Sequence, residues 1–282
     1  MCVTRLQEGV VITTERAAAN VLGDLYVVGI VVVVNAYVLG GFAQLAAVSG
    51  STAGFSIDPA AVDTGSESSV RDLFAAGLRA RTVTIAFAWF AINFGYYGVF
   101  IWLPQTFGAS GTVPAFQLGG VTVSGIYGYF LLIALVQFPG YASAAYLVER
   151  IGRKPTLGGY LLASGVFTFV FAAAMPGAGF GLGIEGFWPF FLALLASSFF
   201  TLGAWGAIYA YTPELFPTAL RATGNGFAGG VGKIAAVVGP ILAGALVPVG
   251  YVAALLPLAV AFALGGVVVL AFGVETKGTP LE

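Results

Sequence analysis

The sequence predicts an all-α membrane protein of about seven transmembrane helices, six of which form one group. Two observations lead to this fold class. Hydrophobic residues make up 59% of the 282 residues and charged residues only 8%, whereas a soluble domain carries about a quarter charged residues on average. The chain also contains a series of apolar stretches, each near the roughly 20 residues that a membrane-spanning helix needs. The lipid bilayer is therefore the expected solvent and partner of this chain.

Seven stretches meet that length, and they define the expected helices in order: 25–49, 82–107, 126–148, 156–175, 188–211, 222–247 and 251–273. The first begins after Glu8, Glu15 and Asp24 and has no basic leader. We therefore interpret it as a span and not as a signal peptide.

A stretch rich in Ser, Thr, Gly and Asp separates the first span from the other six, and this composition is typical of a solvated linker. We predict an N-terminal segment with one helix at 1–50, a cytoplasmic linker at 51–81 and a six-helix unit at 82–282. An ordinary long loop explains the composition as well as a domain boundary does.

Apart from Lys233, the basic residues from position 71 onward lie in alternate connections between the predicted spans or after the last span. They are Arg71, Arg79, Arg81, Arg150, Arg153, Lys154, Arg221 and Lys277. The connections at about 108–125, 176–187 and 247–250 carry no Lys or Arg. Because positively charged connections stay in the cytoplasm, we expect a multi-pass protein of the cell membrane with a cytoplasmic C-terminus. Seven spans then place the N-terminus outside, against which Arg5 and Arg16 argue mildly.

Several catalytic and binding chemistries are excluded by what the chain lacks. It contains no histidine, and its single cysteine is Cys2. This excludes His-based triads, most zinc, copper and haem sites, and an internal disulfide. The net charge is −1, without a basic tail, so nucleic acid is not an expected partner. We expect no cofactor, no metal and no enzymatic activity.

Polar and aromatic side chains follow one face of four grouped spans. Polar groups are costly at membrane depth, and those present usually face a bundle interior or a water-filled cavity. The residues expected to line a substrate cavity are Asn93, Tyr96, Tyr97, Gln137, Trp205, Tyr209, Asn225 and Lys233. Spans 156–175 and 251–273 lack such a stripe, as expected of helices that largely face lipid. For Thr168, Ser198 and Thr201, simple helix–helix contact is the favoured interpretation.

Lys233 stands out within this set because of its depth. It lies twelve residues after Arg221, roughly 18 Å into the helix at 1.5 Å per residue and thus near the bilayer midplane. A lysine there costs at least about 2.5–3.5 kcal/mol unless it finds a partner, and no Asp or Glu lies at similar depth in the predicted spans. We hypothesise that Lys233 attracts an anionic substrate group or pairs with a carboxylate of a partner half. A structural or water-solvated lysine is the alternative.

The aromatic pair Trp205 and Tyr209 lies one turn apart on its predicted helix. Such a pair is placed to stack on an aromatic or sugar-like substrate. Core packing explains the two residues almost equally well.

Two motifs lie in the predicted cytoplasmic connections. Residues 149–155 read E-R-I-G-R-K-P, in which Gly152 permits a tight turn and Pro155 suits the first turn of the next helix. Residues 213–224 read P-E-L-F-P-T-A-L-R-A-T-G. With both motifs at this separation, roughly residues 70–282 resemble the C-terminal six-helix half of the major facilitator superfamily. The second motif, with residues 95–98 and 102–104, is similar to the sugar, organic-ion and aromatic-acid branches.

The resemblance implies a secondary active transporter that moves a small organic solute, such as an organic anion or a sugar, by alternating access and symport. Relatives that handle organic anions often keep a cation in the helix that corresponds to the one carrying Lys233. The resemblance therefore also favours a substrate with a carboxylate. The residues implied for a cytoplasmic gate are Glu149, Arg150, Gly152, Arg153, Lys154, Glu214 and Arg221.

The family pattern requires two six-helix halves, which rock against each other around a site at their interface. Only one half and a leading span are recognisable here. We expect the chain to be a fragment of a longer transporter, and the alternative is a half that pairs with a second chain. The expected partners are therefore a small-molecule substrate and an N-terminal half. A non-transporting membrane sensor or accessory subunit remains the alternative function. An enzyme is not expected, because the sequence offers no nucleophile–base pair and no set of metal ligands.

Overall fold

Inside a bilayer every backbone N–H and C=O must be paired within the protein, and apolar stretches of about 20 residues meet this demand as helices. The computed structural model describes residues 69–278 except 110–113, 115, 119–120, 124, 176–177, 179 and 181. These residues belong to one compact unit, Ser68–Glu282. The predicted span 25–49, the rest of segment 1–50 and linker residues 51–68 lie outside the described residues.

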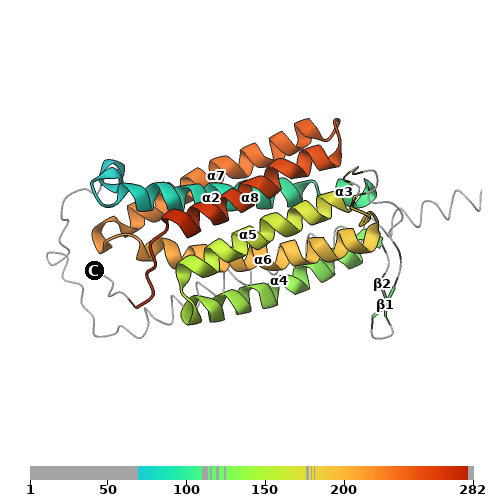
Figure 1. Cartoon of the computed structure of the whole chain (residues 1–282), viewed down its shortest axis with the longest axis horizontal. Helices are drawn as coiled ribbons and strands as arrows, with labels where there is room; N and C mark the ends of the chain where they lie inside the picture. The colour runs from blue at the N-terminus through green and yellow to red at the C-terminus, as the bar shows by residue number, and fades with distance from the viewer. Residues whose placement is uncertain are drawn as a thin grey trace, which may run out of the picture. The chain divides into compact units, whose positions relative to one another are not determined.

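Six long helices make up the described unit, as Figure 1 shows. They are α2 (Arg79–Ile101), α4 (Gly125–Arg150), α5 (Arg153–Ala173), α6 (Phe187–Glu214), α7 (Arg221–Leu246) and α8 (Tyr251–Phe272). Within the described residues, six helices are long and apolar enough to cross a membrane. They coincide with the last six predicted spans to within a few residues, so the predicted helical membrane fold is confirmed for this unit.

The predicted span 82–107 is broken into two helices. α2 ends at Ile101, and the short helix α3 (Leu103–Ala109) follows with Pro104 in its first turn. Between them, the Trp102 indole donates a hydrogen bond to the Pro240 carbonyl of α7 at 2.9 Å. This hydrogen bond fixes the residue between the two helices to α7. A count of apolar residues along the chain does not reveal such a contact.

A short antiparallel hairpin connects α3 to α4 and departs from the purely helical prediction. Its strands are β1 (Phe116–Leu118) and β2 (Val121–Val123), with Gln117 paired to Thr122. The β-branched run in the second strand favours this local structure. It leaves the helical architecture of the bundle unchanged.

The last part of the predicted linker is ordered against the bundle. Ser69 caps the 3₁₀ helix η1 (Val70–Phe74) through a capping box with Asp72. Leu73 is fully buried, and the Thr82 hydroxyl donates to its carbonyl at 2.7 Å. Residues 69–81 therefore carry structure of their own, and only the preceding part of the linker remains a prediction.

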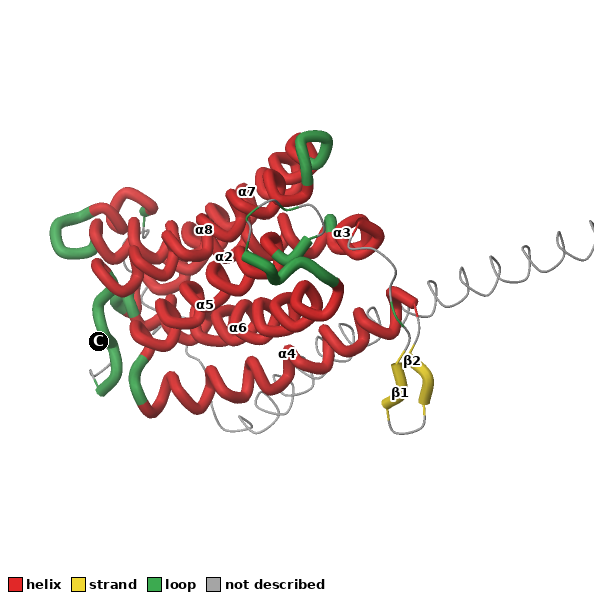
Figure 2. Tube along the Cα trace, turned by 45° about the vertical axis from the view of Figure 1, so that its right-hand side comes forward, coloured by secondary structure: helices red, strands yellow, loops and turns green. Residues whose placement is uncertain are grey.

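The helices form a layered bundle in which α4 and α7 occupy opposite edges, as Figures 1 and 2 agree. α7 packs mainly on α2, α4 packs mainly on α6, and α5 lies between α6 and α8. Most of α5 is consequently buried, while α4 and α7 are the least covered of the six. The prediction that span 156–175 largely faces lipid is therefore wrong. A helix with a largely apolar surface can pack between two other helices as well as it can face lipid.

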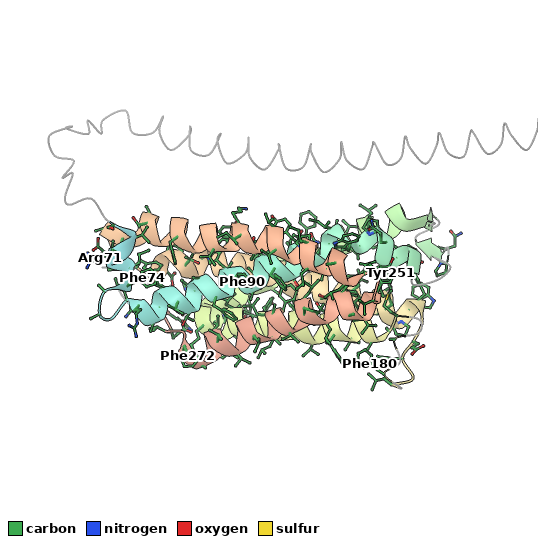
Figure 3. The ribbon with its side chains drawn as sticks, turned by 90° about the horizontal axis from the view of Figure 1, so that it is seen from above. Arg71, Phe74, Phe90, Phe180, Tyr251 and Phe272 are labelled. Carbon is green, nitrogen blue, oxygen red and sulfur yellow. The ribbon has the colours of Figure 1, made fainter. Side chains whose placement is uncertain are left out.

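Aromatic side chains mark the two ends of the bundle. Figure 3 shows Phe74 and Phe272 at one end and Phe180 and Tyr251 at the other. Of these four residues only Tyr251 is of the type, Trp and Tyr, that gathers where a membrane meets water. The six long helices run between these two ends.

Small residues let α7 approach α2 closely. The buried positions of α7 are all small: Gly224, Ala228, Gly232, Ala235, Gly239 and Ala243. A Cβ added to Gly239 would lie 2.4 Å from the Phe94 carbonyl oxygen of α2. Because that atom belongs to a backbone, the contact cannot be relieved by a rotamer change.

We expect Gly239→Ala to destabilise the protein by about 1–3 kcal/mol, because the added methyl group forces α2 and α7 apart. Gly230→Ala in the same helix is the matched control. A Cβ at Gly230 meets nothing within 4 Å, so its higher helix propensity should stabilise by up to about 1 kcal/mol. Thermal unfolding in detergent measures both variants, and equal melting temperatures would contradict this packing.

Candidate functional site

Charged residues gather at one end of the bundle. The helix directions bring together η1, the turn between α4 and α5, the connection between α6 and α7, and the residues after α8, as Figure 1 shows. We call this the charged end. Of the charged residues that the structure describes, only Glu185 and Lys233 lie elsewhere.

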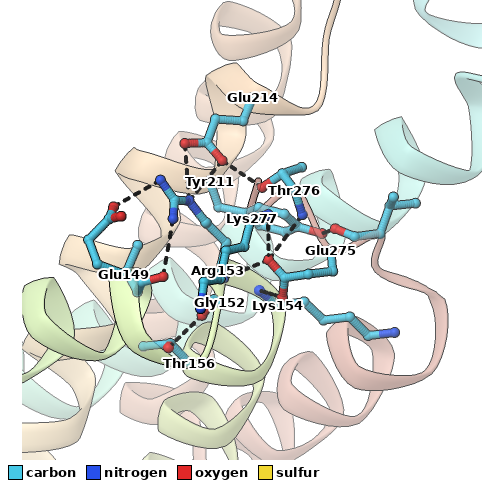
Figure 4. A network of polar contacts seen from close by, with 12 residues as sticks. Glu149, Gly152, Arg153, Lys154, Thr156, Tyr211, Glu214, Glu275, Thr276 and Lys277 are labelled. Carbon is cyan, nitrogen blue, oxygen red and sulfur yellow. Dashed lines mark hydrogen bonds and ion pairs between the residues drawn. The ribbon is translucent and has the colours of Figure 1, made fainter. Parts of the chain in front are cut away.

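Arg153 is the centre of an ion-pair network at the charged end (Figure 4). Its Nη2 lies 2.9 Å from Glu149 Oε1, and its Nε lies 2.9 Å from Glu214 Oε2. The Arg153 and Glu214 side chains are only 15% and 18% exposed. Charge-assisted contacts to a planar guanidinium are strong and directional when water is largely excluded. The pair therefore ties the start of α5 to the end of α6.

Glu275, in the segment after α8, binds the beginning of α5. Its carboxylate accepts the backbone N–H groups of Arg153 at 2.9 Å and Lys154 at 3.1 Å. These are among the N–H groups that a helix start leaves unpaired, and a negative charge there also suits the helix dipole. Gly152 makes this approach feasible, because its φ is +110° and a Cβ would lie 2.4 Å from Glu275 Oε2.

The segment after α8 contacts the network at three further points. The Thr276 hydroxyl donates to Glu214 at 2.5 Å, and Lys277 Nζ donates to the Arg150 carbonyl at 2.7 Å. The Tyr211 hydroxyl donates to the Val274 carbonyl. Sequence reasoning missed Glu275, Thr276 and Tyr211. The available signal was an acidic residue directly after the last span, on the same predicted side as the basic turn at 149–155.

The structure brings together only part of the predicted gate. Glu149, Arg153 and Glu214 are ion-paired, while Gly152 and Lys154 take part through their backbones. The Arg150 guanidinium instead lies 5.3 Å from the centre of the Tyr146 ring. Arg221 Nε donates to the Pro213 carbonyl at 3.0 Å. Arg150 and Arg221 thus make no ion pair with the acidic residues in the described part of the chain.

We expect Glu275→Ala to lower the free energy of unfolding by about 0.5–2 kcal/mol, because the start of α5 loses its capping carboxylate. Glu149→Ala removes an acidic group that is 70% exposed and should cost less than about 1 kcal/mol. Thermal unfolding of both variants tests the difference. A larger loss for Glu149→Ala than for Glu275→Ala would be incompatible with this assignment.

A second group of interest bridges α2 and α6. It consists of Trp89 and Tyr96 from α2 with Trp205 and Tyr209 from α6, and we call it the aromatic group. Ring centroids lie 5.7 Å apart for Trp89–Trp205, 5.1 Å for Trp89–Tyr209 and 6.0 Å for Tyr96–Trp205. Tyr209 is 60% exposed although it lies within a membrane helix. Trp89 and Trp205 are buried, at 6% and 7% exposed, so the aromatic surface on the outside of this unit comes from Tyr209 and, in part, from Tyr96.

Trp89 was missed by sequence reasoning although it lies on the predicted stripe, one turn before Asn93. Its indole donates to the Thr212 hydroxyl at 2.9 Å, which fixes the ring between α2 and α6. Tyr97 continues the aromatic surface through a T-shaped contact with Tyr96 at 5.3 Å. Extending the α2 stripe backward by one turn would have identified Trp89.

Asn93 lies beside the aromatic group, and α7 packs against both at Gly232. Asn93 is buried, its Nδ2 donates to the Trp89 carbonyl at 2.8 Å, and its Oδ1 has no hydrogen-bond partner among the described residues. A Cβ built on Gly232 would lie 2.6 Å from Asn93 Nδ2 and 3.2 Å from Trp89 Cε3. The next residue along α7 is Lys233, which is exposed and has no carboxylate within 4 Å among the described residues.

Gln137 and Asn225 are placed differently. Both are half-buried, and neither forms a hydrogen bond to another described residue. Gln137 lies on α4, at the edge of the bundle opposite α7. Asn225 lies two turns nearer the charged end than Lys233. Their assignment to a substrate cavity stays a prediction.

A six-helix membrane bundle with a charged network at one end is the arrangement that the resemblance to one half of a major facilitator-type protein implies. The family model for the sugar (and other) transporter matches residues 57–282. The chain belongs to this family and thereby to the major facilitator superfamily.

Similar proteins carry transporter names. The candidate niacin/nicotinamide transporter NiaP of Bacillus subtilis (strain 168) is 37% identical over 71% of this chain and 46% of its own length. The niacin transporter NiaP of Acinetobacter baylyi is 35% identical over 76% of this chain and 45% of its own. The synaptic vesicle 2-related protein of Xenopus laevis is 28% identical over 76% of this chain and 39% of its own length. The chain thus spans about half the length of the curated relatives it matches.

Proposed function

We propose that the chain forms the C-terminal half of a secondary transporter that moves a small aromatic carboxylate across the cell membrane. The observation that carries the proposal is Lys233, a cation near mid-helix with no acidic partner among the described residues. Such a charge is costly at membrane depth unless a counter-ion or water compensates it. A substrate carboxylate supplies that counter-ion during transport.

The aromatic group supports an aromatic ring on the same substrate. Trp205 and Tyr209 stack on each other with ring centroids 5.7 Å apart, and Tyr209 keeps an exposed surface. A planar substrate ring gains by packing on such a surface. One relative is named as a candidate niacin/nicotinamide transporter and another as a niacin transporter, and niacin combines a pyridine ring with a carboxylate. We therefore propose niacin or a close analogue as the substrate.

Alternating access requires a second six-helix half, and the exposed apolar faces at the bundle edges suit its docking. The exposed side chains include Leu131, Leu135 and Phe138 on α4, and Ile234, Val237 and Ile241 on α7. In this proposal the charged end is cytoplasmic, in line with its excess of basic residues. The Arg153 network stabilises one state of the transporter, and substrate binding shifts the population towards the other.

Uptake of radiolabelled niacin by cells expressing the protein tests the proposal, in a strain without niacin uptake of its own. We expect saturable uptake that benzoate inhibits, because benzoate keeps the ring and the carboxylate. Nicotinamide, which lacks the charge, and glucose should inhibit far less. Equal inhibition by glucose would overturn the proposal. Binding of niacin without accumulation would instead favour a membrane sensor.

A further inference from the structure

We propose that η1 and the start of α2 form a binding site for the headgroup of an anionic phospholipid. The site consists of Arg71, Phe74 and Arg79, and we call it the lipid site. It lies at the charged end and is separate from the aromatic group and Lys233. The proposal concerns binding to the membrane surface and does not require that the protein transports a solute.

The lipid site is held in place by the bundle. Gly77 has a φ of +92°, a conformation that favours glycine, and it turns the chain between η1 and α2. Leu73 is fully buried and anchors η1. The Phe74 ring meets the Phe227 ring of α7 edge-on, with centroids 5.5 Å apart. The segment is thus a fixed surface feature of the six-helix unit.

The side chains that point outward from this segment combine charge with apolar surface. Phe74 is 40% exposed in spite of its contact with Phe227, and Val70 is exposed beside it. Arg71 and Arg79 are exposed, and neither forms an ion pair with a residue that the structure describes. Figure 3 shows Arg71 and Phe74 at the same end as Phe272. Arg79 is the first residue of α2, a helix long and apolar enough to cross a membrane, so Arg79 and the preceding η1 lie where α2 leaves the hydrocarbon region.

The charge balance of the charged end favours an anionic ligand. Its described residues include eight basic and four acidic side chains, and each acidic side chain already has a protein partner. Asp72 accepts the backbone N–H of Ser69 at 2.9 Å, Glu149 and Glu214 bind Arg153, and Glu275 binds the start of α5. Arg71 and Arg79 are therefore left with unneutralised charge at a membrane surface, which attracts anionic lipids.

The apolar half of the site distinguishes a lipid from a free anion. A soluble phosphate would contact the guanidinium groups alone and would leave Phe74 and Val70 in water. A phospholipid brings its glycerol and upper acyl region to the same place, where exposed rings and basic groups act together. The shared chemistry is a phosphate group, and the covalently attached acyl chains decide between the two ligands.

Native mass spectrometry of the purified full chain in detergent measures this binding directly. The protein is titrated with phosphatidylglycerol and, separately, with phosphatidylcholine of the same acyl chains. We expect tighter binding of phosphatidylglycerol. The double variant Arg71→Ala/Arg79→Ala should bind it roughly 25-fold more weakly, at about fivefold for each arginine near the surface. Arg150→Ala/Lys154→Ala, which removes two other basic groups of the charged end, should retain most of the affinity.

Three outcomes would overturn the proposal: equal affinity for both lipids, equal weakening by the two double variants, or full competition by soluble glycerol phosphate. The last would indicate a site for a free anion. Arg71→Lys/Arg79→Lys keeps both charges and should keep most of the binding, which separates lost charge from lost folding. Circular dichroism verifies that each variant is folded. Because no uptake is measured, a negative result leaves the proposed transport function untouched.

Discussion

For the proposed transport of niacin, Lys233→Met should lower uptake by about 100-fold, because the substrate carboxylate would lose its only cationic partner near mid-helix among the described residues. Removing one member of a desolvated charge pair costs roughly 2–5 kcal/mol, which corresponds to a loss of this size. Methionine keeps an unbranched side chain and removes a charge that is costly in a membrane helix. The variant should therefore insert and fold at least as well as the natural protein.

Two comparisons make the Lys233 result specific. Lys233→Arg keeps the positive charge and should retain part of the uptake, reduced because a guanidinium has a different shape. Any uptake of neutral nicotinamide should change little in Lys233→Met, because no carboxylate is involved. If Lys233→Met takes up niacin and other aromatic carboxylates as the natural protein does, Lys233 has a structural or solvated role.

Arg153→Ala is expected to destabilise the protein by about 2–3 kcal/mol. The substitution leaves Glu214 without its ion-pair partner in a site where both side chains are largely covered, and breaking a fully buried pair costs about 3–5 kcal/mol. Because the Arg153 and Glu214 side chains keep some exposure to water, we expect a loss of stability below that range. The melting temperature in detergent measures the loss.

Lys154→Ala is the matched control, since it removes a neighbouring cation and keeps the backbone N–H that binds Glu275. No ion pair or hydrogen bond of the Lys154 side chain joins it to the described residues, so little change is expected. A loss of stability in Lys154→Ala as large as in Arg153→Ala would show that general charge, and not the Arg153 network, stabilises this end.

Single contacts explain the differences between prediction and structure. The break near Trp102 has a local cause in Pro104, which cannot continue the preceding helix, but the hydrogen bond that holds Trp102 joins it to Pro240, 138 positions away in the chain. Glu275 contacts the start of α5 from more than 120 positions away. Helical periodicity reports which residues share a face, and it carries no information on which helix that face meets. This is also why the burial of α5 was missed.

The sequence by itself determined the membrane environment, the six described helices and the end of the bundle at which charge collects. These follow from local physics, since apolar stretches of this length must pair their backbone groups as helices. Only the tertiary structure decided that Arg153 pairs with Glu149 and Glu214, that Trp89 joins the aromatic group, and that Arg71 and Arg79 remain unpaired within the described part. Such pairings depend on distances between helices, which packing of the whole bundle sets.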